Sequence, residues 1–112
     1  MSAVPGNFDA INREAFERYL LDLVRNSAVE EERLYREAKG EDLHILIRDA
    51  ELQGSYPNTV IRFRRYERAR DIEDWTALPI WTDATFFDQE TGERRMPPEK
   101  IAGDILMLAR GG

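Results

Sequence analysis

Cysteine is absent from the 112 residues, and histidine occurs once, as His44. Without cysteine there can be no disulfide, no thiolate nucleophile, no iron–sulfur cluster and no sulfur-based zinc site. One histidine excludes a histidine-rich metal site and leaves little basis for a histidine-based triad. The sequence also lacks the phosphate-loop, dinucleotide, zinc-protease and serine-hydrolase motifs. We therefore assign no catalytic residue, no metal ligand and no cofactor.

Lysine is scarce and long apolar runs are missing. Fourteen of the 16 basic residues are arginine, and 22 acidic residues give a net charge of −6. Residues 1–56 carry seven basic and twelve acidic side chains, so most of the deficit lies there. No run approaches the ~18 apolar residues that span a bilayer, and residues 1–6 do not resemble a signal peptide. We expect a cytoplasmic protein with no membrane contact, and its acidity disfavours nucleic acid as a general partner.

The apolar pattern predicts a single domain over residues 1–112, with residues 1–7 as a loose N-terminus. Side chains at helical spacing predict a helix over about residues 8–26. The capping-box pattern Ser27-Ala-Val-Glu30 then predicts a second helix over about residues 28–38. The apolar positions of the first helix are Ile11, Ala15, Phe16, Tyr19, Leu20, Leu23 and Val24.

Strands are expected in the middle of the chain. Residues 43–47 and 59–66 are rich in β-branched and aromatic residues, and a loop from Asp49 to Ser55 allows them to pair antiparallel. Residues 75–87 are interrupted by Pro79, which favours either short strands or a kinked edge strand.

A last helix is expected from about Pro98 to Ala109, although residues 105–108 also fit a strand. This order predicts an α+β fold, a two-layer sandwich with N-terminal helices packed on a small antiparallel sheet and a short C-terminal helix. The helical residues Ile11, Phe16, Tyr19, Leu20 and Leu23 should pack on Ile45, Ile47, Ile61 and Phe63 of the sheet.

The chain ends in Arg110-Gly111-Gly112. Over these few residues the tail resembles the ending of ubiquitin-like modifiers, which expose a Gly-Gly for activation. Those proteins have a β-grasp fold that starts with a hairpin, whereas helices come first here. A glycine cap at the end of the last helix explains the same residues.

The most distinctive segment is an arginine strip over residues 62–70, with five arginines and one glutamate. Alternation places Arg62, Arg64 and Tyr66 on one face of a strand, while Ile61 and Phe63 occupy the other. Arginine and aromatic side chains are enriched at binding hot spots. The predicted partner-binding residues are Arg62, Arg64, Tyr66, Arg68, Trp75 and Trp81.

These features favour a small protein-binding module of the inhibitor, immunity, adaptor or chaperone type, and a homodimer is compatible with them. Single-stranded nucleic acid is an alternative, since arginines and rings on a strand suit it. The acidic first half, including Glu30 and Glu31, would instead suit a basic partner.

A small hydrolase would have to use His44, Asp83 and Asp88 around a pocket lined by Trp81 and Phe86. The strip could also protect an edge strand by charge alone.

Overall fold

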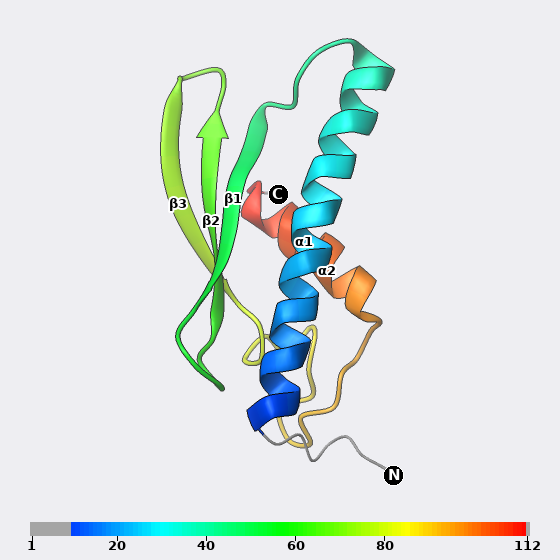
Figure 1. The fold of residues 1–112 in the computed structure, drawn as a ribbon, viewed down its shortest axis with the longest axis vertical. Coiled ribbons are helices and arrows are strands. Elements are labelled where there is room, and N and C mark those ends of the chain that lie inside the picture. Colours follow the sequence, from blue (N-terminus) through cyan, green and yellow to red (C-terminus); the bar gives the residue numbers. More distant parts are fainter. Residues whose placement is uncertain (1–9, 112) are drawn as a thin grey trace.

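The fold was analysed in a computed structural model that describes residues 10–111. The elements are α1 (Ala10–Lys39), β1 (Ile45–Gln53), β2 (Val60–Glu67), β3 (Ile72–Pro79) and α2 (Pro98–Ala109). The strands form one antiparallel sheet in the order β1-β2-β3, with α1 alongside the sheet and α2 behind α1 in this view (Figure 1). The α+β prediction is confirmed, and the expected loose end at residues 1–7 lies outside the described residues.

The helix α1 runs unbroken for 30 residues, so the predicted break at Ser27 is wrong. It contains no glycine or proline, and a serine inside a helix costs only about 0.5 kcal/mol relative to alanine. Beyond the serine, Arg33 pairs with both Glu30 and Glu37, one helical turn away on either side. Good helix formers and ion pairs therefore outweigh the local capping signal.

The strand β1 extends beyond the end of the predicted strand at residues 43–47. It can do so because a β-bulge changes which residues of the strand face the core. Strict alternation from Ile47 would turn Asp49 towards the helices. In the structure the register shifts between these two residues, and Arg48 is the extra residue. Ala50 then faces the core and is buried. The predicted loop from Asp49 is thus mostly strand.

The strand β3 lies at the edge of the sheet and ends at Pro79. This fits a proline that lacks the N–H needed to continue a ladder. After it, residues 80–97 form turns with an isolated bridge between Phe87 and Arg94. The predicted second short strand in residues 75–87 is therefore wrong, and its edge-strand alternative begins earlier, at Ile72.

The C-terminal segment is helical, which settles the choice between helix and strand for residues 105–108. Gly111 has a positive φ of 94°, and its N–H donates to the carbonyl oxygen of Leu108. This glycine closes α2, as its cap interpretation predicts. Gly112 lies outside the described residues.

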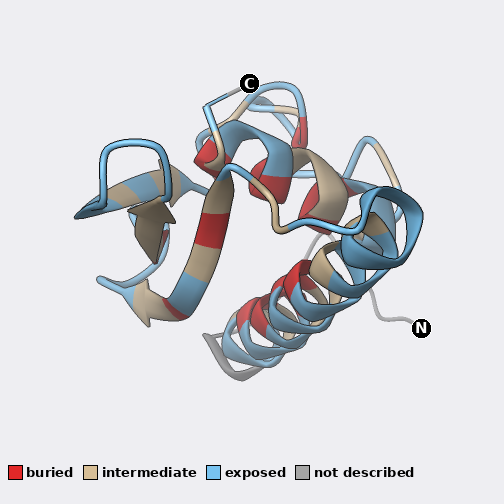
Figure 2. Ribbon diagram, turned by 90° about the horizontal axis from the view of Figure 1, so that it is seen from above, coloured by how far each residue is buried: buried red, intermediate tan, exposed pale blue. Residues whose placement is uncertain are grey.

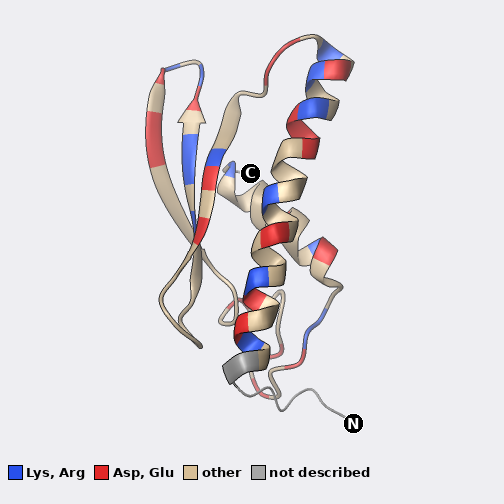
Figure 3. Cartoon of the chain, in the orientation of Figure 1, with Lys and Arg blue, Asp and Glu red and all other residues tan. Residues whose placement is uncertain are grey.

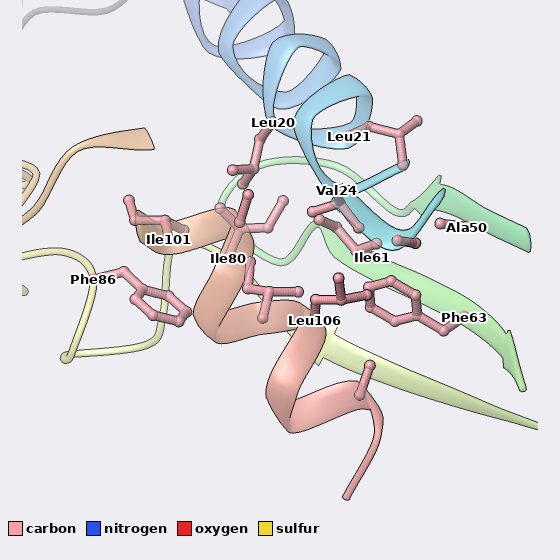
Figure 4. Packing of buried hydrophobic residues seen from close by; sticks show 14 of the residues in the cluster. Leu20, Leu21, Val24, Ala50, Ile61, Phe63, Ile80, Phe86, Ile101 and Leu106 are labelled. Atoms are coloured by element: carbon pink, nitrogen blue, oxygen red, sulfur yellow. The ribbon is translucent and has the colours of Figure 1, made fainter. Parts of the chain in front are cut away.

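The core lies between α1, α2, the helix-facing side of the sheet and residues 80–87 (Figure 4). Leu20, Ile61 and Phe63 are fully buried, as predicted. Tyr19 is not a core residue: it is 46% exposed, and its hydroxyl donates to Glu99 of α2. The other predicted packing residues, Phe16, Leu23, Ile45 and Ile47, are half-buried, and the side chain of Ile11 lies outside the described residues.

Candidate functional site

The sheet has an inner face that packs on the helices and an outer face on the other side. Figure 2 shows both helices on one side of the sheet. Phe63 of β2 is buried in the cluster that includes α1 and α2, and Arg65 donates to the carbonyl oxygen of Ala109 in α2. Their strand neighbours point the opposite way. By this register the outer face includes Leu46, Arg48, Asp49, Glu51, Arg62, Arg64, Tyr66, Glu73, Trp75 and Ala77.

Two arginines on the outer face stack on aromatic rings. The guanidinium carbon of Arg62 lies 4.0 Å from the centroid of the Trp75 ring, and that of Arg48 lies 4.9 Å from the Tyr66 centroid. Cation–π contacts of this kind are worth about 0.5–1 kcal/mol at exposed sites. The ring of Trp75 stays 43% exposed. The rings thus hold the guanidinium groups in fixed positions on a rigid sheet.

The acidic residues of the outer face balance part of this charge. Arg64 pairs with Glu73 of β3 at 3.1 Å, while Asp49 and Glu51 are the cross-strand neighbours of Arg64 and Arg62. Figure 3 shows the resulting mixture of basic and acidic positions along the strands. Within residues 10–111, Arg48 and Arg62 form no ion pair. Their charges are the ones available to an external group.

A hydrogen bond links two side chains at the end of this face that lies next to the β2–β3 turn. The hydroxyl of Tyr66 donates to a carboxylate oxygen of Asp71 at 2.6 Å. This bond raises the pKa of Tyr66 above its ordinary value, because it favours the protonated hydroxyl. Asp71 has a positive φ of 54° in the turn between β2 and β3, a region that aspartate tolerates better than most residues.

Four of the six predicted partner-binding residues gather on the outer face: Arg62, Arg64, Tyr66 and Trp75. Arg68 lies apart in the β2–β3 turn, where its side chain donates to the carbonyl oxygen of Asp42. Trp81 does not belong to the site. It is 8% exposed and packs in the core, away from the outer face of the sheet.

Sequence reasoning missed the contributions of β1 and β3 to this face. Asp49 and Glu51 join it only because of the bulge, which no residue pattern in β1 indicates. Glu73 is not among the predicted binding residues, yet it pairs with Arg64 across the sheet. The alternation of residues 72–79 carried a usable signal for it, since Glu73 and Trp75 share one face of a strand.

The residues of the hydrolase alternative do not form a common site. His44 is exposed and immediately precedes β1, whose start lies at the opposite end of the molecule from residues 80–97 in Figure 1. Asp83 accepts a hydrogen bond from the backbone N–H of Thr85, and Asp88 accepts two from its own turn. These bonds lower the pKa of Asp88. Both aspartates act as turn residues.

The acidic alternative surface is partly neutralised by its own chain. Glu30 pairs with Arg33, and Glu31 pairs with Arg110 beyond the end of α2. The exposed pair of Glu30 with Arg33 contributes little stability, but both pairs lower the charge presented to a basic partner. Glu32 is the member of this acidic triplet that has no ion pair within the described residues.

No helix among residues 10–111 is long and apolar enough to cross a membrane. No protein-family model matches the chain, and comparisons with curated proteins and with solved structures found no significant match. A fold class alone does not identify a function, so the outer face of the sheet has to be judged on its own chemistry.

Proposed function

We propose that this chain is a protein-binding module whose contact surface is the outer face of the sheet. The observation that carries the proposal is the exposed stack of Arg62 on Trp75. A ring with a guanidinium above it combines apolar area with directed hydrogen-bond donors, and these two residue types dominate binding hot spots. The strands hold both side chains in place, so little conformational entropy is lost on binding.

The partner chemistry that suits this surface is a protein segment with carboxylates. A guanidinium that stacks on a ring keeps its N–H donors in its own plane, pointing sideways. Arg62 and Arg48 are free of ion pairs within residues 10–111. Each can therefore form a bidentate pair with a partner's aspartate or glutamate. The neighbouring Asp49 and Glu51 would penalise a misplaced acidic group and so restrict the register of binding.

Two features favour protein over single-stranded nucleic acid. Bases bind such sheets by stacking on ring faces, but Arg62 and Arg48 already cover one face each of Trp75 and Tyr66. The carboxylates of Asp49, Glu51 and Glu73 lie on the same surface and would repel phosphates. Single-stranded nucleic acid is therefore the competing ligand that the experiment must distinguish from a protein partner.

The test is site-specific photo-crosslinking in a lysate of the source organism. A photoreactive amino acid replaces Ala77, an exposed outer-face residue and the cross-strand neighbour of Arg62, or Ala38, exposed on α1. We expect a defined protein adduct from position 77 and none from position 38. The adduct should be lost with Arg62→Glu and kept with Arg94→Glu, a matched charge reversal outside the sheet.

Three results would count against the proposal. One is an adduct that survives Arg62→Glu. Another is an adduct lost only with Glu32→Lys, which would transfer the contact to the acidic side of α1. The third is retention of a labelled single-stranded oligonucleotide, lost with Arg62→Glu and weakened steeply by salt, which would replace the protein partner by nucleic acid. Unchanged thermal melting of each variant ensures that only folded proteins are compared.

A further inference from the structure

A buried carboxylate lies at the other end of the molecule from the β2–β3 turn. Glu17 of α1 is only 6% exposed, and one of its oxygens accepts a hydrogen bond from the indole N–H of Trp81 at 2.7 Å. It forms no ion pair within residues 10–111. Burying a carboxylate without a cationic partner is costly, and proteins normally compensate it with a positive charge. The indole hydrogen bond supplies only part of that compensation.

Aromatic rings surround the indole that donates to this carboxylate. The ring centroids of Trp81 lie 4.9 Å from Phe87, 5.3 Å from Tyr56 and 5.5 Å from Phe16. The guanidinium carbon of Arg13 lies 3.9 Å from the centroid of Tyr56. The outer ring of this cluster therefore already holds a cation against its face, as cation–π attraction requires.

A cavity of about 260 Å³ opens beside Glu17, between the first turns of α1 and the turn that joins β1 to β2. Its lining is Arg13, Glu14, Glu17, Gly54, Ser55 and Tyr56. A second hollow of about 230 Å³ shares Arg13 and Tyr56 with it and reaches Trp81. The two acidic residues outweigh Arg13, so the first cavity has a net negative lining.

We propose that this cavity binds an alkylammonium group, either a free primary amine or the side chain of a lysine from another protein. The ammonium would compensate the charge of Glu17 and donate hydrogen bonds to it and to Glu14, while the alkyl chain packs on Tyr56. The residues do not suggest a metal site, because no group of three or more ligating side chains gathers within residues 10–111. The site is separate from the outer face of the sheet.

The test follows the indole N–H signals of the unmodified protein by NMR. The chain has two tryptophans. Trp81 reports on the cavity, and Trp75 on the outer face serves as an internal control, with the signals assigned from a Trp75→Phe spectrum. We expect n-butylammonium chloride to shift the Trp81 signal saturably and to leave Trp75 unchanged. Sodium butyrate at equal ionic strength should move neither signal.

Glu17→Gln removes the charge and keeps an oxygen for the indole, and we expect it to weaken butylammonium binding at least tenfold. Glu90→Gln, in the exposed turn after Asp88, should leave the affinity unchanged. Should Glu17→Gln melt at a lower temperature, Tyr56→Leu provides a second variant at a 44% exposed position, with the same expected loss. The proposal fails if neither butylammonium nor a lysine-containing peptide binds saturably, or if butyrate binds as well as butylammonium. It also fails if both variants retain wild-type affinity for butylammonium.

The two sources of the ammonium group are separated by a blocked Gly-Lys-Gly peptide. Similar binding of the peptide and butylammonium supports a lysine side chain as the ligand. Saturable binding of butylammonium alone supports a free amine. Binding of the peptide that persists when lysine is replaced by norleucine would overturn the role of the ammonium.

Discussion

The two faces of β2 are built from neighbouring residues and follow opposite rules. On the inner face Ile61 and Phe63 are fully buried, whereas on the outer face Arg62 and Arg64 remain partly exposed over Trp75 and beside Glu73. The inner face is held by apolar burial. Its free energy grows with the buried area, and a cavity left by a truncated side chain lowers the stability further. The outer face is held by weak, directed contacts between side chains that remain partly exposed. Buried apolar contacts and exposed polar contacts are thus separated by one step along the chain.

Two single-residue deletions in β1 test how the bulge keeps these faces apart. Deletion of Ala50 should abolish cooperative folding, because either Asp49 or Glu51 would then face the core and a buried unpaired charge costs several kcal/mol. Deletion of Arg48 restores plain alternation and should cost about 1 kcal/mol, the order of its lost contact with Tyr66. Urea unfolding measures both. Equal losses from the two deletions would contradict the assignment of the extra residue.

Adjacent truncations in β2 measure the difference directly. Ile61→Ala should lower the free energy of unfolding by about 2–5 kcal/mol, since it removes buried methyl groups and leaves a cavity. Arg62→Ala should cost less than about 1 kcal/mol, because only an exposed contact is lost. The comparison uses urea midpoints at constant slope. An Arg62→Ala variant less stable than Ile61→Ala would contradict the difference between the two faces.

A double-mutant cycle isolates the stack on the outer face. Arg62→Gln, Trp75→Leu and the double variant should give a coupling energy of about 0.5–1 kcal/mol in the free protein. Salt should weaken it only slightly, since the attraction is short-ranged. A coupling of zero would mean that the guanidinium is not held by the ring, and the outer face would lose its preorganised donor.

In acid, the protein should lose the stability that an ion pair on the inner side of the sheet contributes. A hydrogen bond from Arg65 lowers the pKa of Asp74 on this side of the sheet. A lowered folded-state pKa stabilises the protein above the ordinary aspartate value of about 3.9 and loses this effect as pH falls through the lowered value. Asp74→Asn should therefore flatten the acid limb of stability against pH. An acid limb of Asp74→Asn that matches wild type would contradict a contribution from this hydrogen bond.

In alkali, the smallest effect should come from the outer face. The raised pKa of Tyr66 stabilises the protein below the ordinary tyrosine value of about 10 and loses this effect as pH rises through the raised value. Tyr66→Phe should reduce the loss of stability as pH rises above about 10. Urea midpoints across this range measure it, and an unchanged slope would disprove the contribution of the Asp71 hydrogen bond.

The regular patterns were sufficient to predict several elements from the sequence. Alternation in residues 60–67 correctly separated Phe63 from Arg62 and Arg64, and Pro98 marked the start of the last helix. These succeed because side-chain direction in a regular element follows from backbone geometry alone. The outer-face grouping of Arg62, Arg64 and Tyr66 was predictable for the same reason.

Other features depended on contacts between distant residues. The capping pattern at Ser27 is local, and the fold overrode it with a continuous helix. The extra residue Arg48 is recognisable only once β1 is paired with β2. Trp81 resembled a surface anchor in the sequence, but the rings of three other segments enclose it and Glu17 accepts its N–H. Local periodicity determined which way the side chains of β2 point, and tertiary packing decided which of them are covered and where β1 takes up an extra residue, because burial and pairing depend on neighbours far away in the chain.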